Sequence, residues 1–315
     1  MSSPHSAPHP QPRVAVLLAT YNGARWLDEQ LDSILGQQGV DLRVIALDDE
    51  STDGTFERLA ERATTDARLT VLPRRGSSGS AAANFYRLLR AAETEPGELV
   101  AFADQDDVWR PGKLARHARL LTEGGFDGVS SNVSSFTSDG RHTLVRKDYP
   151  QRPFDFVLES AGPGSTFLMT PRLVELVRST LDSADVLATT AHSHDWLIYA
   201  IARSHGFSWH IDSEPSVDYR QHDGNVVGAN LGARSALRRL SLIRRQWHRE
   251  QAGVIARVGL SVASAELQPG LERLVALIGD RGIRSRLALA RRAGELRRRP
   301  RDQWVIRVLV ALGVW

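Results

Sequence analysis

Short apolar runs alternate with stretches of helical periodicity along the first two hundred residues. The apolar runs predict strands at residues 14–19, 44–47, 69–72 and 99–103. Between them, apolar positions three and four residues apart predict helices at residues 24–37, 55–67 and 84–92. This order is typical of parallel strands joined by right-handed crossover helices, so we expect a three-layer α/β fold.

The remaining elements are expected to complete this domain and to add a helical extension. They are a helix at 111–121, a Ser-rich strand with one wet face at 129–136, a strand at 167–169, helices from 171 and around 195–203, and a strand at 217–222. Residues 233–315 predict helices, with breaks near Pro269 and Pro300. The chain then divides into a disordered tail (1–12), an α/β domain (13–230) and a basic helical extension (231–315).

Charge is distributed unevenly along the chain. The net charge is +3, but residues 231–315 hold 18 Arg, no Lys and 6 acidic residues, whereas residues 1–230 hold 22 basic and 31 acidic residues. An Arg-rich segment attracts anionic lipid or nucleic acid, or it forms the solvated face of a helix. The acidic and basic parts of the chain therefore have different roles.

Composition also limits the chemistry and the location. Cysteine is absent, so any metal ion must bind to carboxylate, His, carbonyl or water ligands. No apolar run reaches the roughly 18 to 20 residues that span a bilayer. Residues 1–12 lack the apolar core of a secretory signal, so we expect a cytoplasmic protein.

Two acidic turns follow predicted strands. Asp48 and Asp49 come directly after the second strand, and Asp104 with Asp106 and Asp107 comes after the fourth. Ligands of open α/β sheets bind at the carboxyl ends of strands, so the two turns indicate one shared crevice. Neighbouring carboxylates repel one another, and Mg²⁺ or Mn²⁺ relieves this repulsion while keeping positions open for phosphate. The pattern predicts a diphosphate site, unless these residues simply cap the helices that follow.

Four motifs occur in order along the region that contains these turns. They are Leu18-Ala-Thr-Tyr-Asn-Gly23, Leu31-Asp-Ser-Ile-Leu-Gly-Gln37, Leu47-Asp-Asp-Glu-Ser-Thr-Asp-Gly-Thr55 and Phe102-Ala-Asp-Gln-Asp-Asp-Val-Trp109. With them, residues 13–230 resemble the inverting family-2 glycosyltransferases of GT-A fold, in particular the bacterial rhamnosyltransferase-like branch. Three later segments agree with that branch: Gly162-Pro-Gly-Ser-Thr166, His194-Asp-Trp196 and Tyr219-Arg-Gln-His-Asp-Gly-Asn225. Glu50 departs from the family, which commonly has Gly or Asn there.

The resemblance implies a GT-A domain, a Rossmann-like three-layer α/β/α fold that binds a nucleotide diphospho-sugar. It also implies transfer of a sugar from a dTDP- or UDP-sugar, with dTDP-rhamnose as one candidate. The acceptor would be a hydroxyl of a glycan or of a lipid-linked sugar, and the anomeric carbon would be inverted. Such a reaction belongs to cell-surface polysaccharide synthesis.

By the same resemblance, the nucleotide is expected to bind at five residues: Thr20, Tyr21, Asp48, Asp49 and Asp104. A carboxylate that accepts a hydrogen bond from a pyrimidine N3–H is a physical reason for an acidic residue there. The alternative is that these carboxylates cap their own turns.

The resemblance further implies metal ligands and a base. Asp106, Asp104 and His222 are expected to bind Mg²⁺ or Mn²⁺, which stabilises the charge on the leaving nucleoside diphosphate. Asp195 matches the general base that takes the proton of the acceptor hydroxyl, although it could also cap its own helix. Contacts to the diphosphate or the acceptor are expected from Arg220, Gly164 and Ser165.

The chain ends in an apolar segment at residues 304–315 that is flanked by Trp and preceded by arginines at 297–301. Such a segment suits a helix that lies on an anionic membrane surface, where a lipid-linked acceptor is found. We would then expect peripheral attachment at the inner face of the plasma membrane. The alternative is a helix packed on the protein's own core or on the partner of a homo-oligomer.

Two other classes of protein compete with the transferase hypothesis. A sugar nucleotidyltransferase shares the α/β fold and acidic metal site, but residues 20–23 lack its Gly-rich triphosphate loop. A nucleic-acid-binding protein would use the C-terminal arginines, but aromatic residues are sparse among them and no recognition module occurs. The transferase is therefore the favoured hypothesis.

Overall fold

The computed structural model describes residues 11–137, 140–183, 186–221 and 247–315. The strands in these ranges are β1 (Arg13–Thr20), β2 (Asp41–Asp48), β3 (Leu69–Val71), β4 (Leu99–Ala103), β5 (Val108–Trp109), β6 (Gly128–Phe136), β7 (His142–Val145), β8 (Leu168–Met169) and β9 (Trp209–Arg220). The α-helices are α1 (Leu27–Leu35), α2 (Thr55–Thr65), α3 (Ala81–Ala91), α4 (Lys113–Gly124), α5 (Pro171–Asp182), α6 (His194–His205), α8 (Trp247–Ser261), α9 (Gln268–Gly279), α10 (Ile283–Arg291), α11 (Ala293–Leu296) and α12 (Pro300–Leu312).

The strands of the described residues form one mixed sheet in the order β3-β2-β1-β4-β8-β6-β9-β5, with β7 paired to β6. Strands β2, β1 and β4 are parallel neighbours, and in their register Thr20 pairs with Asp48 and Leu18 with Ala103. The carboxyl ends of these three strands therefore lie side by side. Both acidic turns leave the sheet at this edge, as the sequence predicted.

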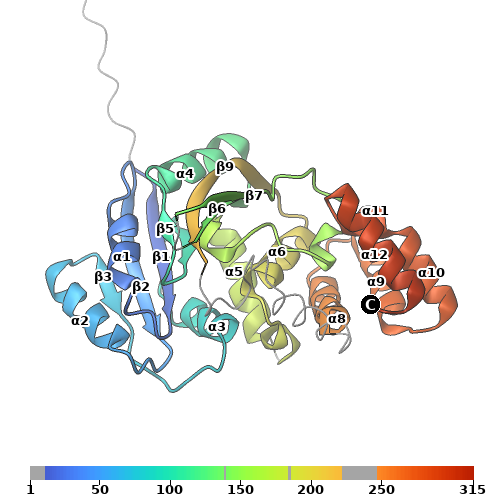
Figure 1. The fold of residues 1–315 in the computed structure, drawn as a ribbon, viewed down its shortest axis with the longest axis horizontal. Helices are drawn as coiled ribbons and strands as arrows, with labels where there is room; N and C mark the ends of the chain where they lie inside the picture. Colours follow the sequence, from blue (N-terminus) through green and yellow to red (C-terminus); the bar gives the residue numbers. More distant parts are fainter. Residues whose placement is uncertain (1–10, 138–139, 184–185, 222–246) are drawn as a thin grey trace, which may run out of the picture.

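Helices cover both faces of the sheet, so the predicted three-layer α/β architecture is confirmed (Figure 1). Alternate side chains of β1 point to opposite faces of the sheet and so enter two different cores. Val16 and Leu18 pack in one core with helices α1, α2 and α4, whereas Leu17 and Ala19 face a second core with α3, α5 and α6. Helices α8 to α12 continue this second core at one end of the molecule (Figure 1).

The expectation of a wet face on the Ser-rich strand is wrong. Strand β6 is buried on both faces from residue 128 to 135, because β8 and β9 flank it and helices cover the sheet. Its hydroxyls have buried partners: Ser131 Oγ lies 2.6 Å from Ser216 Oγ, and Ser130 Oγ accepts from Trp209 Nε1 at 3.0 Å. A strand of small polar residues can therefore be internal when each polar group has a partner.

Several element boundaries also differ from the prediction. Strand β9 begins at Trp209, eight residues before the predicted start, because it continues through a polar stretch that contains Pro215. Strands β5 and β7 were not predicted. The expected C-terminal breaks are confirmed, since α9 begins one residue before Pro269 and α12 begins at Pro300. The predicted tail and the predicted boundary near residue 230 lie largely outside the described residues.

Candidate active site

The turns after β1 and β2 are joined through the carboxylate of Asp48. This buried group accepts hydrogen bonds from Thr20 Oγ1 at 3.0 Å and from the backbone N–H of Ser51 at 2.9 Å. The guanidinium of Arg74 lies 3.0 Å from its second oxygen. Both oxygens of Asp48 therefore have protein partners, and the residue fixes the two turns relative to each other.

Asp49 lies one residue further along the same turn and contacts a different loop. Its carboxylate accepts from the backbone N–H of Ser78 at 2.5 Å and from Ser78 Oγ at 2.8 Å. Arg87 of α3 lies 3.7 Å away. Asp49 is buried, and both of its carboxylate oxygens have partners in the loop between β3 and α3.

Glu50, the departure from the family pattern, has a positive φ of 62°. Residues with a Cβ rarely adopt this left-handed conformation, and Gly and Asn tolerate it best. The geometry thus explains why Gly or Asn is common at this position. The Glu50 side chain accepts a hydrogen bond from Gly76 N at 3.0 Å, and the neighbouring Asp49 and Ser51 are hydrogen-bonded to Ser78 and Asp48.

The first turn is also tied to the Asp-rich turn, through Gln105. The Gln105 side chain accepts from Tyr21 N at 2.5 Å and donates to Tyr21 O at 2.7 Å. Gly23 is required here because a Cβ at that position would lie 2.4 Å from the Gln105 side chain. Tyr21 itself is 56% exposed, so its ring is accessible to a ligand. Sequence reasoning missed Gln105, which stands between two more conspicuous acidic residues.

The Asp-rich turn concentrates negative charge in a poorly solvated position. Burial, together with the charges of Asp106 and Asp195, raises the pKa of Asp104 to about 7. Burial and the same turn's carboxylates also raise the pKa of Asp107 well above its usual range. A bound cation would relieve this repulsion.

Lys113 lies directly beneath the turn and is fully enclosed. Its ammonium donates to the carbonyl of Ser165 at 2.5 Å and lies 3.0 Å from the centre of the Trp109 ring. Burial lowers the pKa of Lys113, and the charges of Asp107 and Asp104 oppose that shift. Sequence reasoning did not single out this lysine, because nothing in its local pattern distinguishes it from a surface residue.

The three residues expected at the diphosphate or acceptor gather around the same turn. Arg220, at the end of β9, donates from Nε to the carbonyl of Asp106 at 2.9 Å. Ser165 is buried, and its hydroxyl donates to Asp107 at 2.8 Å. The neighbouring Gly164 is in contact with a ring, since a Cβ there would lie 2.2 Å from His194 Nε2.

Asp195 lies in the first turn of α6, close enough to Asp104 for its charge to raise the pKa of that group. It accepts from Trp196 N at 2.6 Å and from the hydroxyl of Ser193, so it does contact its own helix start. The preceding His194 stacks on Phe85 with ring centres 3.9 Å apart. This packing holds the beginning of α6 against α3.

The donor set at the turn fits a hard divalent cation. Among the described residues, no group of three or more His, Cys, Asp or Glu side chains is arranged to hold a metal ion. A Mg²⁺ or Mn²⁺ ion at a diphosphate typically uses one or two carboxylates and takes its other ligands from phosphate and water. Asp104 and Asp106 supply such carboxylates, and burial, with the charges of Asp106 and Asp195, raises the pKa of Asp104. His222 lies outside the described residues.

The fold and site define a class of protein: an α/β protein with two acidic turns at the ends of adjacent parallel strands. A family model described as Glycosyl transferase family 2 matches residues 15–178. The chain belongs to this family and is a glycosyltransferase. This result displaces the nucleotidyltransferase and nucleic-acid-binding alternatives.

Known proteins resemble the chain over nearly its full length. It is 33% identical over 300 residues to the dTDP-rhamnosyl transferase RfbG of Shigella flexneri, which covers 95% of this chain and 100% of that protein. The crystal structure of S. aureus TarS 1-349 in complex with UDP-GlcNAc matches with a TM-score of 0.57 and 18% identity, over 96% of this chain and 81% of that one. Mannosyltransferase PcManGT from Pyrobaculum calidifontis, solved with GDP-Man and Mn2+, matches with a TM-score of 0.53 and 22% identity, over 97% and 81%. The predicted GT-A fold is confirmed.

Proposed function

We propose that this glycosyltransferase moves a sugar from dTDP-rhamnose, or a related dTDP- or UDP-sugar, to a hydroxyl of a glycan or lipid-linked acceptor, with inversion and with a divalent metal. The observation that carries the proposal is the meeting of the two acidic turns and Asp195 at one edge of the sheet. The end-to-end similarity to a dTDP-rhamnosyl transferase supports the choice of nucleotide and sugar. A role in cell-surface polysaccharide synthesis follows from that choice.

The nucleotide would lie along the turns after β1 and β2. The exposed Tyr21 ring can stack on the base, since stacking on an aromatic face needs an accessible ring. The Asp49 carboxylate would accept the pyrimidine N3–H in place of the Ser78 hydroxyl. Asp48 and Thr20 would act by holding this turn, because their side chains bond to each other.

The diphosphate would lie at the Asp-rich turn. Asp104 and Asp106 would hold Mg²⁺ or Mn²⁺, which acts as a Lewis acid and stabilises the charge on the leaving group. Arg220 is placed to donate to phosphate oxygens, since its guanidinium already lies against this turn. Ser165 supports the turn from below through its bond to Asp107, and Lys113 donates to the Ser165 carbonyl.

Asp195 would act on the acceptor. Its carboxylate takes the proton of the acceptor hydroxyl as the oxygen attacks the anomeric carbon, and the carbon–oxygen bond to the diphosphate breaks on the opposite face. The bonds from Ser193 and Trp196 N hold the carboxylate in place. One displacement on the face opposite the leaving group inverts the anomeric carbon.

The donor is tested by measuring release of nucleoside diphosphate from dTDP-rhamnose, UDP-glucose and GDP-mannose. Each donor is incubated with the protein and Mn²⁺, and a parallel reaction contains a chelator. We expect the fastest release from dTDP-rhamnose, further acceleration by a lipid-linked glycan acceptor, and loss of release with the chelator. Equal release with the chelator would contradict metal dependence, and no release from any dTDP- or UDP-sugar would contradict the proposed donor.

A further inference from the structure

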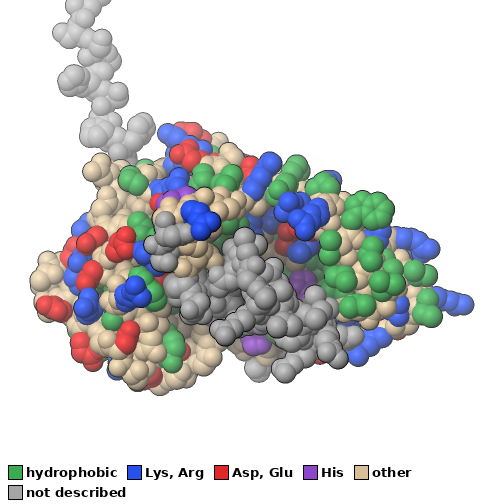
Figure 2. All heavy atoms as spheres, in the orientation of Figure 1, with side chains coloured by type: hydrophobic (Ala, Val, Ile, Leu, Met, Phe, Trp, Pro, Cys, Tyr) green, Lys and Arg blue, Asp and Glu red, His purple; other side chains and the backbone are tan. Residues whose placement is uncertain are grey.

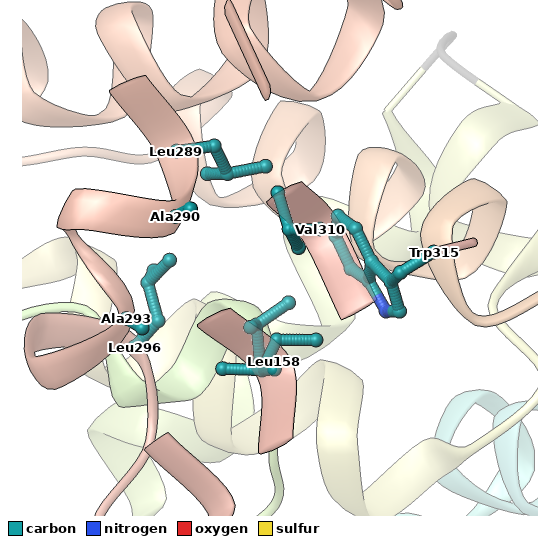
Figure 3. A pocket seen from close by; sticks show the side chains of 8 residues that line it. Leu158, Leu289, Ala290, Ala293, Leu296, Val310 and Trp315 are labelled. Carbon is teal, nitrogen blue, oxygen red and sulfur yellow. The ribbon is translucent and has the colours of Figure 1, made fainter. Parts of the chain in front are cut away.

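Helix α12 is apolar on two opposite faces. Its inner face carries Ile306 and Val310, which are buried with Trp315. Figure 3 shows Val310 and Trp315 together with Leu158 and with side chains of α10 and α11, which surround the same apolar space. Helix α12 therefore packs on the protein's own core through this face, which was one of the two expectations for the C-terminal segment. The buried residues are only part of the apolar surface of the helix.

The outer face of the same helix is uncovered. The large apolar residues of α12 that are exposed have helical spacing and therefore share one face of the helix. They are Trp304, Val305, Val308 and Leu312. Trp304 is 64% exposed and Leu312 67%. The neighbouring helix α10 adds Ile283, which is 69% exposed, and Leu287. These six residues are called the outer C-terminal face.

Positive charge predominates around the outer C-terminal face, although Asp280 just before α10 is also exposed. Five arginines of residues 281–315 are exposed: Arg281, Arg284, Arg291, Arg299 and Arg301. The two acidic residues of this segment are only half-exposed, and Glu295 forms an ion pair with Arg292 at 2.7 Å. Figure 2 shows hydrophobic side chains and blue Lys or Arg side chains gathered over the C-terminal helices.

We propose that the outer C-terminal face docks on an anionic lipid bilayer, with α10 and α12 lying in the membrane interface. Apolar residues and a Trp on α10 and α12, with exposed arginines in and next to the same helices, are complementary to acyl chains and anionic headgroups. No helix among the described residues is long and apolar enough to cross a membrane, so the helices lie along the surface. The surface is separate from the catalytic turns, and its existence does not rest on the proposed donor.

Cosedimentation with vesicles tests this docking surface. The full chain is mixed with vesicles of phosphatidylcholine alone or with phosphatidylglycerol, at low and high salt. We expect binding to the anionic vesicles at least tenfold tighter than to neutral ones, and weaker binding at high salt because exposed charges are screened. A triple variant, Trp304→Ser with Val308→Ser and Leu312→Ser, is expected to lose binding at least tenfold, since the buried face stays intact.

The control is Leu144→Ser, which removes a 57% exposed leucine on β7 outside this face and should bind vesicles like the wild type. Thermal unfolding of the triple variant, with and without dTDP and Mn²⁺, shows that it is folded and separates membrane binding from donor binding. Equal binding to neutral and anionic vesicles, or no binding, would overturn the proposal. A wild-type dimer in solution that the triple variant dissociates would also overturn it, because the face would then be a protein interface.

Discussion

Replacing Asp195 by Asn is expected to lower kcat by about 10²–10⁴-fold, the usual contribution of a positioned general base. The amide cannot take the proton of the acceptor hydroxyl. Its carbonyl can still accept hydrogen bonds from Trp196 N and Ser193, so the start of α6 should be preserved. Steady-state kinetics with the preferred donor and an acceptor measures the change, and nucleotide affinity should stay the same.

The matched control for this substitution is Asp182→Asn. Asp182 ends α5, its side chain is 61% exposed, and its ion pair with Arg90 lies on the surface. An exposed ion pair contributes little to stability, so this variant should retain wild-type kcat. If Asp195→Asn retained more than a tenth of wild-type kcat, Asp195 would not be the base.

Replacing Lys113 by Met is expected to destabilise the protein by about 3–5 kcal/mol, the usual effect of removing one partner from a buried charge cluster. Methionine fills a similar space but leaves the Ser165 carbonyl without its donor. It also leaves Asp104 and Asp107 without the positive charge that opposes their repulsion. Urea unfolding measures the loss.

Arg119→Met is the control for Lys113, because Arg119 is an exposed cation on the same helix α4. We expect this variant to change the free energy of unfolding by less than about 0.5 kcal/mol, as is usual for surface substitutions. Were Lys113→Met as stable as Arg119→Met, the lysine would not support the acidic turn.

The positions of β1 to β4 along the chain and the acidic turns could be predicted because their signals are local. Strands buried on both faces give continuous apolar runs, and each run here ends in polar residues that must leave the sheet. The register of β1 with β2 and β4 then brings Thr20, Asp48 and Asp104 to one edge, as expected from parallel topology. The family motifs in the same positions reinforced this prediction.

Residues whose role depends on distant partners could not be predicted. Gln105 joins two turns that are 84 positions apart in sequence, and Lys113 reaches a carbonyl 52 positions away. Strand β6 was predicted to have a wet face because serine is usually exposed. Its serine hydroxyls instead bond to Ser216 of β9 and to the carbonyl of Ala161, and neither partner is close to β6 in sequence. The burial of only one face of α12 likewise depends on where α10 and α11 pack.

The proposed reaction requires the Asp-rich turn to bind a nucleoside diphosphate together with a metal ion. The most direct measurement is a calorimetric titration of dTDP into the wild type and into Asp106→Asn, each with Mn²⁺ and with a chelator. We predict that Mn²⁺ tightens dTDP binding to the wild type at least tenfold and that Asp106→Asn abolishes this gain. Equal affinity in all four titrations, or no dTDP binding to the wild type with Mn²⁺, would contradict the account.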